Sequence, residues 1–444
     1  MLSSLKLILP KVKNSSFFKS STLTSAVRGG GMFVNLLLTI FISKLISAEG
    51  LGLINLSNQI INIIIMIVLL GFQTVIVKET AIAKSRSNLN RIHSVIYSCI
   101  VTTFPLVIGF YVLRYFFGDN VLGYFFDDSL ISPFNIISSA IVFQIFSRIF
   151  SSVLNGVGKV WQSSLVDESL NLLIVLVLIG ILYTSKATIN IVTIAACYLI
   201  SRIIVFIVIY IYWRFGNEEY STKGSLSKKY VGGSLLKAGL PLLFVQATHN
   251  IANSIDTIMI GGYLTPKDVG IYSIAYKLAF VSSFILQITN AVLAPRIASM
   301  YANDQIPAMQ KMISKVNIGL FIAGAGSFLV LVLAGKFMLR IWGSEFDDGY
   351  IPLLILGVGQ FINVITGCVG LIITLCGQEK AWGVMTLISA IANTLLNILL
   401  INFLGIIGAA LATATTMALL NIFGVYFVKK RVGVSTMFFL NRKK

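Results

Sequence analysis

The sequence has 444 residues, of which 57% are hydrophobic and only 11% are charged, and its mean hydropathy is +0.90. This composition excludes a soluble protein and predicts one that crosses a membrane many times. The net charge of +18 would suggest nucleic-acid binding in a soluble chain. Because cytoplasmic loops of membrane proteins also collect Lys and Arg, we expect no nucleic-acid partner.

The cysteines give no indication of metal or redox chemistry. Cys99, Cys197, Cys368 and Cys376 lie in or beside apolar segments and form no CxxC motif and no Cys/His cluster. We therefore expect no metal site, no cofactor and no disulfide framework. The N-terminal segment has no apolar region followed by a small-residue cleavage site, so we expect that the first span inserts the protein directly.

Twelve hydrophobic runs are long enough to cross a bilayer, which takes about 20 residues. They lie near residues 23–46, 53–76, 93–117, 131–154, 163–185, 188–213, 239–262, 270–293, 314–337, 350–376, 381–404 and 407–428. Several runs are separated by only a few residues, which is typical of helical hairpins. The predicted fold class is an all-α integral membrane protein with about twelve transmembrane helices.

The positions of the charges predict the orientation of these spans. If the N-terminus is cytoplasmic, most Lys and Arg residues fall in cytoplasmic segments, whereas the acidic residues Asp119, Asp127 and Asp347 fall outside. Positive charge concentrates on the cytoplasmic side of membrane proteins. We therefore expect both termini in the cytoplasm.

The longest predicted cytoplasmic connection divides the chain into two lobes. It covers residues 217–238 and is polar, basic and contains Gly and Ser, as is typical of a linker. We expect an N-terminal lobe of six helices over residues 1–216 and a C-terminal lobe of six helices over residues 239–444, which ends in a short basic tail.

An internal repeat supports two related lobes. Residues 42–60 align without a gap with residues 260–278, at an offset of 218 residues that places Gly52 on Gly270. Because six spans separate the two copies, they share an orientation, and a pseudo-twofold axis would run along the membrane normal. Two such lobes would leave a cleft for a substrate that is transported by alternating access.

A polar stripe marks the seventh predicted span. Gln246, His249, Asn253 and Asp256 recur at three- and four-residue spacing, which gathers them on one side of a helix. Lipid cannot satisfy these groups, so we expect them to line a transport pathway, together with Asn35, which the repeat matches to Asn253. His249 and Asp256 have no counterpart in the first lobe and would couple transport to H⁺ or Na⁺. The structural alternative is an interhelical ion pair and a hydrogen-bonded His.

Four basic residues fall inside predicted spans, and they are Arg28, Arg148, Arg202 and Lys277. An unpaired charge near the middle of a span, such as Arg202, costs several kcal/mol and needs an anion. Together the four would give a positively charged cavity that suits an anionic head group. For the other three, the alternative is that the long side chain reaches the lipid head groups.

Three glycines, Gly29, Gly30 and Gly31, follow Arg28 in the first span. They would let this helix bend or unwind as a gate, or else allow close packing against a neighbouring helix. Asp167 and Glu168 lie near the cytoplasmic end of the fifth span, where we favour a solvated or paired structural role.

No catalytic or nucleotide-binding motif is present. The chain lacks GxxxxGK[ST], HExxH and a recognisable Ser/His/Asp set. We therefore expect that it is not an enzyme, and that a gradient or the downhill movement of its substrate drives transport.

The two-lobe arrangement and the hairpin sequence ISKLISAEGLGLINL, echoed as IGGYLTPKDVGIYSI, resemble the polysaccharide-export branch of the multidrug/oligosaccharidyl-lipid/polysaccharide (MOP) exporter superfamily. Within it the chain is similar to Wzx-type O-antigen flippases. The resemblance implies a MATE-like pair of six-helix bundles in the bacterial inner membrane. It also implies movement of an undecaprenyl-pyrophosphate-linked oligosaccharide from the cytoplasmic to the periplasmic leaflet, with a polysaccharide polymerase and a chain-length regulator as partners.

Two other functions remain open. A cation-coupled multidrug exporter would share the fold but should have an acidic or aromatic cavity, whereas buried bases outnumber buried acids here. A membrane glycosyltransferase or polysaccharide polymerase should carry a large outer loop with catalytic residues, and the sequence has none.

Overall fold

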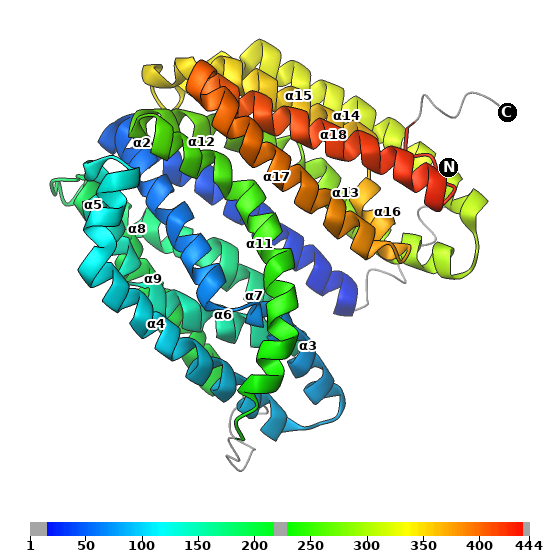
Figure 1. Cartoon of the computed structure of the whole chain (residues 1–444), viewed down its shortest axis with the longest axis horizontal. Helices are drawn as coiled ribbons and strands as arrows, with labels where there is room; N and C mark the ends of the chain where they lie inside the picture. The colour runs from blue at the N-terminus through cyan, green and yellow to red at the C-terminus, as the bar shows by residue number, and fades with distance from the viewer. Residues whose placement is uncertain (1–15, 217–228, 438–444) are drawn as a thin grey trace. The chain divides into compact units, whose positions relative to one another are not determined.

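The computed structural model describes residues 16–216 and 229–437, which are helical almost throughout and contain no strand (Figure 1). Within the helices, the side chains of residues 16–22, 168, 245, 248, 249 and 251–253 are outside the described set. Residues 217–228 of the predicted linker and residues 438–444 of the predicted basic tail also lie outside the described residues.

The chain forms two compact units. Unit 1 contains the chain up to Ile46 and Ser57–Ala247, and unit 2 contains Ser47–Leu56 and the chain from Thr248 onward. The sequence predicts a linker over residues 217–238 between the lobes, and the second boundary between the compact units lies inside α11, after Ala247. The short segment Ser47–Leu56 belongs with the second unit although it is early in the sequence.

The helices of unit 1 follow one another with short connections. They are α2 (Ser16–Val68), α3 (Phe72–Ser85), α4 (Leu89–Phe125), the short η1 (Asp128–Leu130), α5 (Ile131–Ser138), α6 (Ile141–Gly156), α7 (Val160–Ser164), the π-helical turn η2 (Leu165–Ser169), α8 (Leu170–Thr184) and α9 (Ile191–Phe215). Helix α6 packs against α3 and α9, and α5 also packs against α9. Helix α11 (Gly232–Tyr263) continues from unit 1 into unit 2.

Unit 2 is built around a layer of long helices. Its elements are α12 (Pro266–Val281), α13 (Phe284–Ala302), α14 (Ile306–Arg340), η3 (Ser344–Gly349), α15 (Tyr350–Thr366), α16 (Val369–Leu375), α17 (Glu379–Leu404) and α18 (Ile406–Arg431). Helix α18 packs against both α17 and α15, and α14 packs against α15. A capping box of Thr265 and Asp268, with Pro266 in the first turn, sets the start of α12.

The membrane-spanning pattern of the described residues agrees with a multi-pass protein. Seven helices are long and apolar enough to cross a bilayer, and three further pairs, each bent by 44° to 51°, would each make one span. Helix α2 contains an apolar stretch of 46 residues, Leu23–Val68, which is more than twice the length that one crossing needs. It covers most of the first two predicted spans, and Ser47, with φ 67°, marks the predicted hairpin between them.

Two glycines of the internal repeat form a reciprocal contact within unit 2. A Cβ atom on Gly52 would overlap the carbonyl oxygen of Pro266, and a Cβ atom on Gly270 would overlap the carbonyl oxygen of Ala48. Gly52 and Gly270 differ by 218 residues, and so do Ala48 and Pro266. Each contact is therefore the twofold mate of the other, which supports the repeat in the register that the sequence predicts.

We expect Gly270→Ala to destabilise the protein, because the new methyl group would meet backbone rather than a flexible side chain. The cost should be about 1–3 kcal/mol, as is typical of overpacking. Thermal unfolding of the purified protein in detergent should show a lower midpoint than for the wild type. Gly30→Ala is the control, because a Cβ at Gly30 meets nothing within 4 Å. Equal midpoints for the two variants would contradict the close contact.

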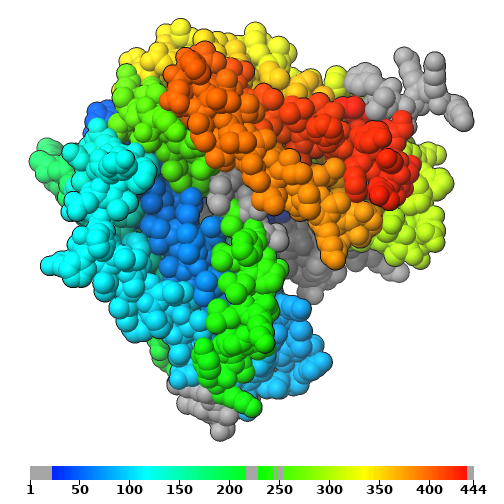
Figure 2. Space-filling model, in the orientation of Figure 1, coloured from blue at the N-terminus to red at the C-terminus, as the bar shows by residue number. Residues whose placement is uncertain are grey.

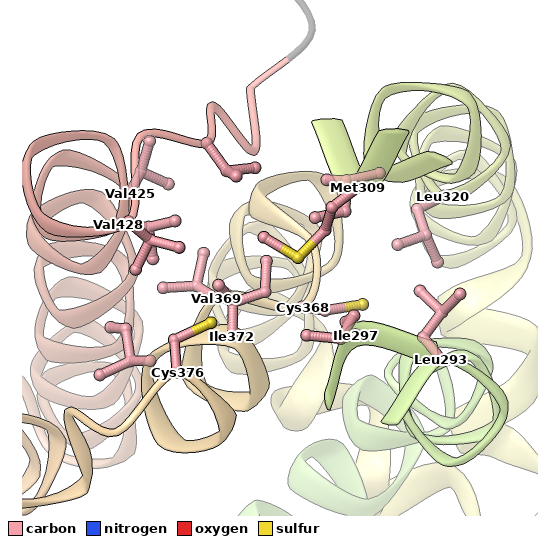
Figure 3. Close-up of a cluster of buried hydrophobic side chains, with 14 of the residues drawn as sticks. Leu293, Ile297, Met309, Leu320, Cys368, Val369, Ile372, Cys376, Val425 and Val428 are labelled. Atoms are coloured by element: carbon pink, nitrogen blue, oxygen red, sulfur yellow. The ribbon is translucent and has the colours of Figure 1, made fainter. Parts of the chain in front are cut away.

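The hydrophobic core of unit 2 includes the end of the described chain. Figure 3 shows Leu293, Ile297, Met309, Val425 and Val428 among the side chains that converge there. Beyond α18, Val432 and Val434 belong to the same core. Gln310 of α14 holds this segment through two hydrogen bonds, since its Nε2 donates to the Ser435 carbonyl at 2.9 Å and its Oε1 accepts from the Ser435 N–H at 2.6 Å. The chain after α18 is thus docked at least as far as Thr436, which is also buried.

Candidate functional site

A buried carboxylate lies in unit 2, where three helices meet around Asp256 of α11. Asp256 is 5% exposed and accepts three hydrogen bonds. The Tyr272 hydroxyl of α12 donates to Oδ2 at 2.8 Å, Asn397 Nδ2 of α17 donates to Oδ1 at 2.7 Å, and the Thr413 hydroxyl of α18 also donates to Oδ2. We call Asp256, Tyr272, Asn393, Asn397 and Thr413 the carboxylate cluster.

A second layer of hydrogen bonds orders the carboxylate cluster. Asn393 and Asn397 are four residues apart and so lie on one face of α17. Asn397 Nδ2 donates to Asn393 Oδ1 at 3.1 Å, and Asn393 Nδ2 donates to the Thr413 hydroxyl at 3.1 Å. The groups that contact Asp256 are thus held in place by one another.

No cation balances the carboxylate in the described part of the chain. None of the ion pairs between described residues includes Asp256. A buried charge without a partner is costly, so the carboxyl group must either take up a proton or bind a cation. The oxygens of Asp256, Thr413 and Asn397 are the ligand type that hard cations prefer, and Asn397 Oδ1 is buried without a hydrogen bond to any described residue.

Two arginines come together inside unit 1. Arg148 of α6 donates from Nη2 to Asn62 Oδ1 at 2.8 Å, and Arg202 of α9 donates from Nη2 to Asn58 Oδ1 at 2.6 Å. Arg202 is 5% exposed and also donates from Nη1 to the Ile137 carbonyl at 3.3 Å. Asn58 and Asn62 are four residues apart on α2, so one helix face supplies both partners.

A small cavity of about 60 Å³ adjoins these arginines, and we call the residues around it the arginine cluster. The polar residues that line it are Gln144, Ser147, Arg148, Asp167, Asn171 and Arg202. Asp167 lies in the π-helical turn η2, accepts a hydrogen bond from the Ser151 hydroxyl at 2.6 Å and interacts electrostatically with Arg148. Turns of this kind often occur at functional sites.

The charges of the arginine cluster do not cancel. Arg148 and Arg202 carry two positive charges, and among the described residues that line the cavity Asp167 supplies the only negative charge. Two polar atoms there, Arg202 Nε and Gln144 Oε1, are buried without a hydrogen-bond partner among the described residues. The cavity is therefore suited to a small anionic group that can accept a hydrogen bond from Arg202.

Two of the four cations that we predicted for one cavity line the arginine cluster. Arg148 and Arg202 line the arginine cluster in unit 1, whereas Lys277 is half-buried on α12 in unit 2. Arg28 is exposed on α2, which continues as a regular helix through the predicted gating residues Gly29–Gly31. Asp167, for which we favoured a structural role, lies beside the arginines.

The polar stripe of α11 is divided between the two units. Gln246 belongs to unit 1, where its Nε2 donates to the Thr74 hydroxyl at 2.6 Å, and Asp256 belongs to unit 2. Asn35 is half-buried on α2. The side chains of His249 and Asn253 lie outside the described residues, so their predicted roles stay predictions.

Sequence reasoning missed two members of the carboxylate cluster, Tyr272 and Thr413. The four-residue spacing of Asn393 and Asn397 indicates a polar helix face, but such a face suits sugar binding and helix packing equally well. The available signal was the second polar run nearby, in which Thr413 and Thr416 lie three residues apart on the next helix. Two polar faces on consecutive helices indicate a shared polar interior between them.

Comparisons with known proteins agree on the type of molecule. A family described as polysaccharide biosynthesis protein matches residues 17–301. The probable low-salt glycan biosynthesis flippase Agl15 of Haloferax volcanii is 24% identical over 201 residues, which cover 43% of this chain and 43% of that protein. The chain spans less than half the length of the curated relatives it matches.

Two solved structures share the fold. An inward-facing multidrug resistance MATE family transporter of the MOP superfamily superposes with a TM-score of 0.73 at 16% identity, over 92% of this chain and 98% of the other. The lipid II flippase MurJ in an inward closed conformation gives a TM-score of 0.70 at 16% identity, over 92% of this chain and 87% of the other. The predicted all-α, MATE-like membrane fold is thereby confirmed.

Proposed function

Because the chain belongs to the polysaccharide biosynthesis protein family, we propose that it is a flippase for a lipid-linked polysaccharide repeat unit and not an enzyme. The proposed substrate is an undecaprenyl-pyrophosphate-linked O-antigen or a related repeat unit, as for Wzx-type proteins. It would move from the cytoplasmic to the periplasmic leaflet of the bacterial inner membrane by alternating access, with both termini of the protein in the cytoplasm. A polysaccharide polymerase and a chain-length regulator would act on the product.

The observation that carries this proposal is the arginine cluster. A lipid-linked oligosaccharide has a diphosphate between its sugar and its lipid, and this diphosphate is its charged part, which cannot cross lipid unaided. Arginine forms strong, directional hydrogen bonds with phosphate oxygens, and Arg202 Nε has no hydrogen-bond partner in the described part of the chain. The cavity of about 60 Å³ holds at most a small part of such a head group, such as phosphate oxygens. The rest of the substrate would lie outside it.

The remaining predicted residues have supporting roles in the proposal. Arg28 and Lys277 would contact the diphosphate at other stages of its passage. Gln246, Asn253 and Asn35 would meet sugar hydroxyl groups along the pathway, and Gly29–Gly31 would let α2 bend. The polyprenyl chain would stay in lipid, which needs no polar contact from the protein.

Transport would be coupled to an ion gradient through the carboxylate cluster. Asp256 would alternate between an ion-bound and an ion-free state, with H⁺ or Na⁺ as the ion and with His249 nearby in the sequence. An ion bound at Asp256 would favour one arrangement of α11, α12, α17 and α18 over another, which is how a ligand shifts a conformational equilibrium. We treat this site and the arginine cluster as separate sites with separate tests.

A multidrug exporter is the second candidate, because the unpaired carboxylate of Asp256 would also attract an organic cation. The arginine cluster opposes this candidate, since its net positive charge repels cationic drugs. Sensitivity to ethidium in a pump-deficient host distinguishes the two functions. A flippase leaves this sensitivity unchanged.

Complementation of strains that lack their own repeat-unit flippase tests the proposed function. We expect surface polysaccharide to return in at least one member of a panel of such strains, and the lipid-linked intermediate to stop accumulating. Immunoblots of surface polysaccharide and of the membrane-inserted protein provide the two measurements. A protein that inserts normally but restores no member of the panel, and instead confers resistance to ethidium, would contradict the proposal.

A further inference from the structure

A pocket outside both clusters lies at the C-terminal end of α4. Its volume is about 460 Å³, and its lining residues are Tyr111, Arg114, Tyr115, Asp119 and Asn135. All belong to α4 and α5 of unit 1, which are coloured in shades of cyan in Figures 1 and 2. This volume lies within the range of ligand-binding pockets, which is about 300–1,000 Å³.

The end of α4 extends beyond the hydrocarbon core of a membrane. The helix has 37 residues and is therefore about 55 Å long, whereas the core is about 30 Å thick. Its N-terminal end lies beside the basic residues Lys84 and Arg86 and carries Arg91 in its first turn, so the positive-inside rule places that end in the cytoplasm. The pocket then lies on the outer side, where a flipped oligosaccharide would emerge.

Hydrogen bonds between protein groups fix the pocket in advance. Arg114 donates from Nε to Asn135 Oδ1 at 3.1 Å and from Nη1 to the Ser139 hydroxyl at 3.2 Å. Asn135 in turn donates from Nδ2 to Asp119 Oδ1 at 2.9 Å. The Tyr111 hydroxyl donates to the Ser139 carbonyl at 2.8 Å. A ligand would thus meet side chains that are already ordered, which lowers the cost of binding.

The groups that remain available match a sugar. Arg114 Nη2 and Asp119 Oδ2 make no hydrogen bond with described residues, so the pocket offers a donor beside an acceptor. The two charges cancel, which favours a neutral ligand whose hydroxyl groups both donate and accept. The ring of Tyr115 is an apolar surface for the C–H face of a pyranose, and this residue is 84% exposed.

We propose that this pocket binds the sugar part of the transported molecule, as a saccharide subsite on the outer side of unit 1. The proposal rests on the flippase function proposed above and adds the chemical class of the group that is recognised. Arg114 and Asp119 bind vicinal hydroxyl groups, Tyr115 stacks on the sugar ring, and Asn135 positions both charged side chains.

The competing explanation is that Tyr115 belongs to a belt of aromatic residues at the membrane interface, where Tyr is common. Helix α4 provides a matched control for it. Tyr124 is 83% exposed on the same helix, but it does not line the pocket. If both residues belong to an interfacial belt, substitution of Tyr115 and of Tyr124 should affect sugar binding equally. If the pocket is a saccharide subsite, only substitution of Tyr115 should weaken sugar binding.

Binding of a soluble sugar to the full-length protein in lipid nanodiscs tests the proposal. The probe is the repeat-unit oligosaccharide that mild acid releases from the lipid-linked intermediate, which accumulates in the flippase-deficient strain before complementation. Saturation-transfer NMR should detect the transfer of magnetic saturation from protons of the protein to protons of the bound sugar. We expect Tyr115→Ala and Asp119→Asn each to weaken binding about tenfold, a factor that corresponds to about 1.4 kcal/mol. Tyr115→Phe, which keeps the ring, and Tyr124→Ala should bind like the wild type.

The possible outcomes separate this proposal from the flippase function. If complementation succeeds but the wild type shows no transfer, or if Tyr115→Ala and Tyr124→Ala behave alike, the saccharide subsite is wrong and the flippase function stands. If complementation fails in every strain, the oligosaccharide from any one of them serves as the probe. Selective loss of binding in Tyr115→Ala then supports the subsite alone. Thermal unfolding midpoints verify that each variant is folded.

Discussion

Asp256→Asn should abolish the response of transport to an ion gradient while leaving the protein folded. The substitution keeps the size of the side chain and removes the only charge of the carboxylate cluster. Coupling between two ligands of one protein is typically about 1–3 kcal/mol, so we expect gradient-driven flux to fall by about five- to 150-fold. The measurement is flux of lipid-linked oligosaccharide in proteoliposomes under an imposed Na⁺ or pH gradient.

The cluster should tolerate this change because of the hydroxyl groups around Asp256. Those of Tyr272 and Thr413 donate to the carboxylate, but a hydroxyl can also accept a hydrogen bond, so both can turn to meet an amide. Removal of a buried charge also removes its desolvation cost, which often leaves stability unchanged or higher. Lost coupling with an unchanged unfolding midpoint would therefore indicate a lost ion site rather than a misfolded protein.

The effect of Na⁺ on the stability of the wild type and of Asp256→Asn identifies the ion. If Na⁺ binds, it should stabilise the wild type, by about 2.7 kcal/mol at a concentration 100 times its dissociation constant, and should have no effect on Asp256→Asn. If H⁺ binds, Na⁺ should stabilise neither protein, and flux should follow the pH gradient. Asp348→Asn, in an exposed position, is the control. A full gradient response in Asp256→Asn would contradict the assigned role of this residue.

The membrane spans could be predicted because they depend on local composition. A run of about 20 apolar residues has few alternatives to a transmembrane helix. The predicted span at 188–213 and helix α9, Ile191–Phe215, agree closely because Asn190 and Thr193 form a capping box that fixes the start. At residues 47–52 the sequence predicts a loop between two spans. The structure instead has a helical segment with one left-handed residue, Ser47.

The pairing of polar residues could not be predicted, because it depends on which helix faces meet. The position of Arg202 in a predicted span indicates that it needs a partner, and the four-residue spacing of Asn58 and Asn62 indicates a polar helix face. The choice between a carboxylate, a substrate and an Asn as the partner of Arg202 depends on how α2 and α9 pack. Asp167, for which the sequence favours a solvated or paired structural role, accepts a hydrogen bond from Ser151 and interacts electrostatically with Arg148. The π-helical turn in which it lies could not be predicted, because no sequence pattern identifies such a turn.

Arg202→Gln should abolish complementation of surface polysaccharide, and the lipid-linked intermediate should accumulate. A hydrogen bond to a charged group contributes about 1.5–3 kcal/mol, so loss of one such bond to phosphate weakens binding by roughly 10- to 150-fold. Arg202→Lys should give an intermediate result, because a Lys retains the charge but not the fork of donors. Immunoblots of surface polysaccharide, normalised to the amount of protein in the membrane, measure both effects.

If Arg202 only connects two helices, removal of its partner Asn58 should have the same effect as removal of Arg202. The hydrogen bond of 2.6 Å between Arg202 and Asn58 connects α9 to α2. Asn58→Ala breaks this connection but leaves the positive charge in place, so it should retain most of the surface polysaccharide if Arg202 serves the substrate. Arg340→Gln is the control for loss of a cation, because Arg340 pairs with Asp347 at an exposed position, where ion pairs contribute little. If Asn58→Ala and Arg202→Gln lose surface polysaccharide equally, the arginine connects two helices and the diphosphate must be bound elsewhere.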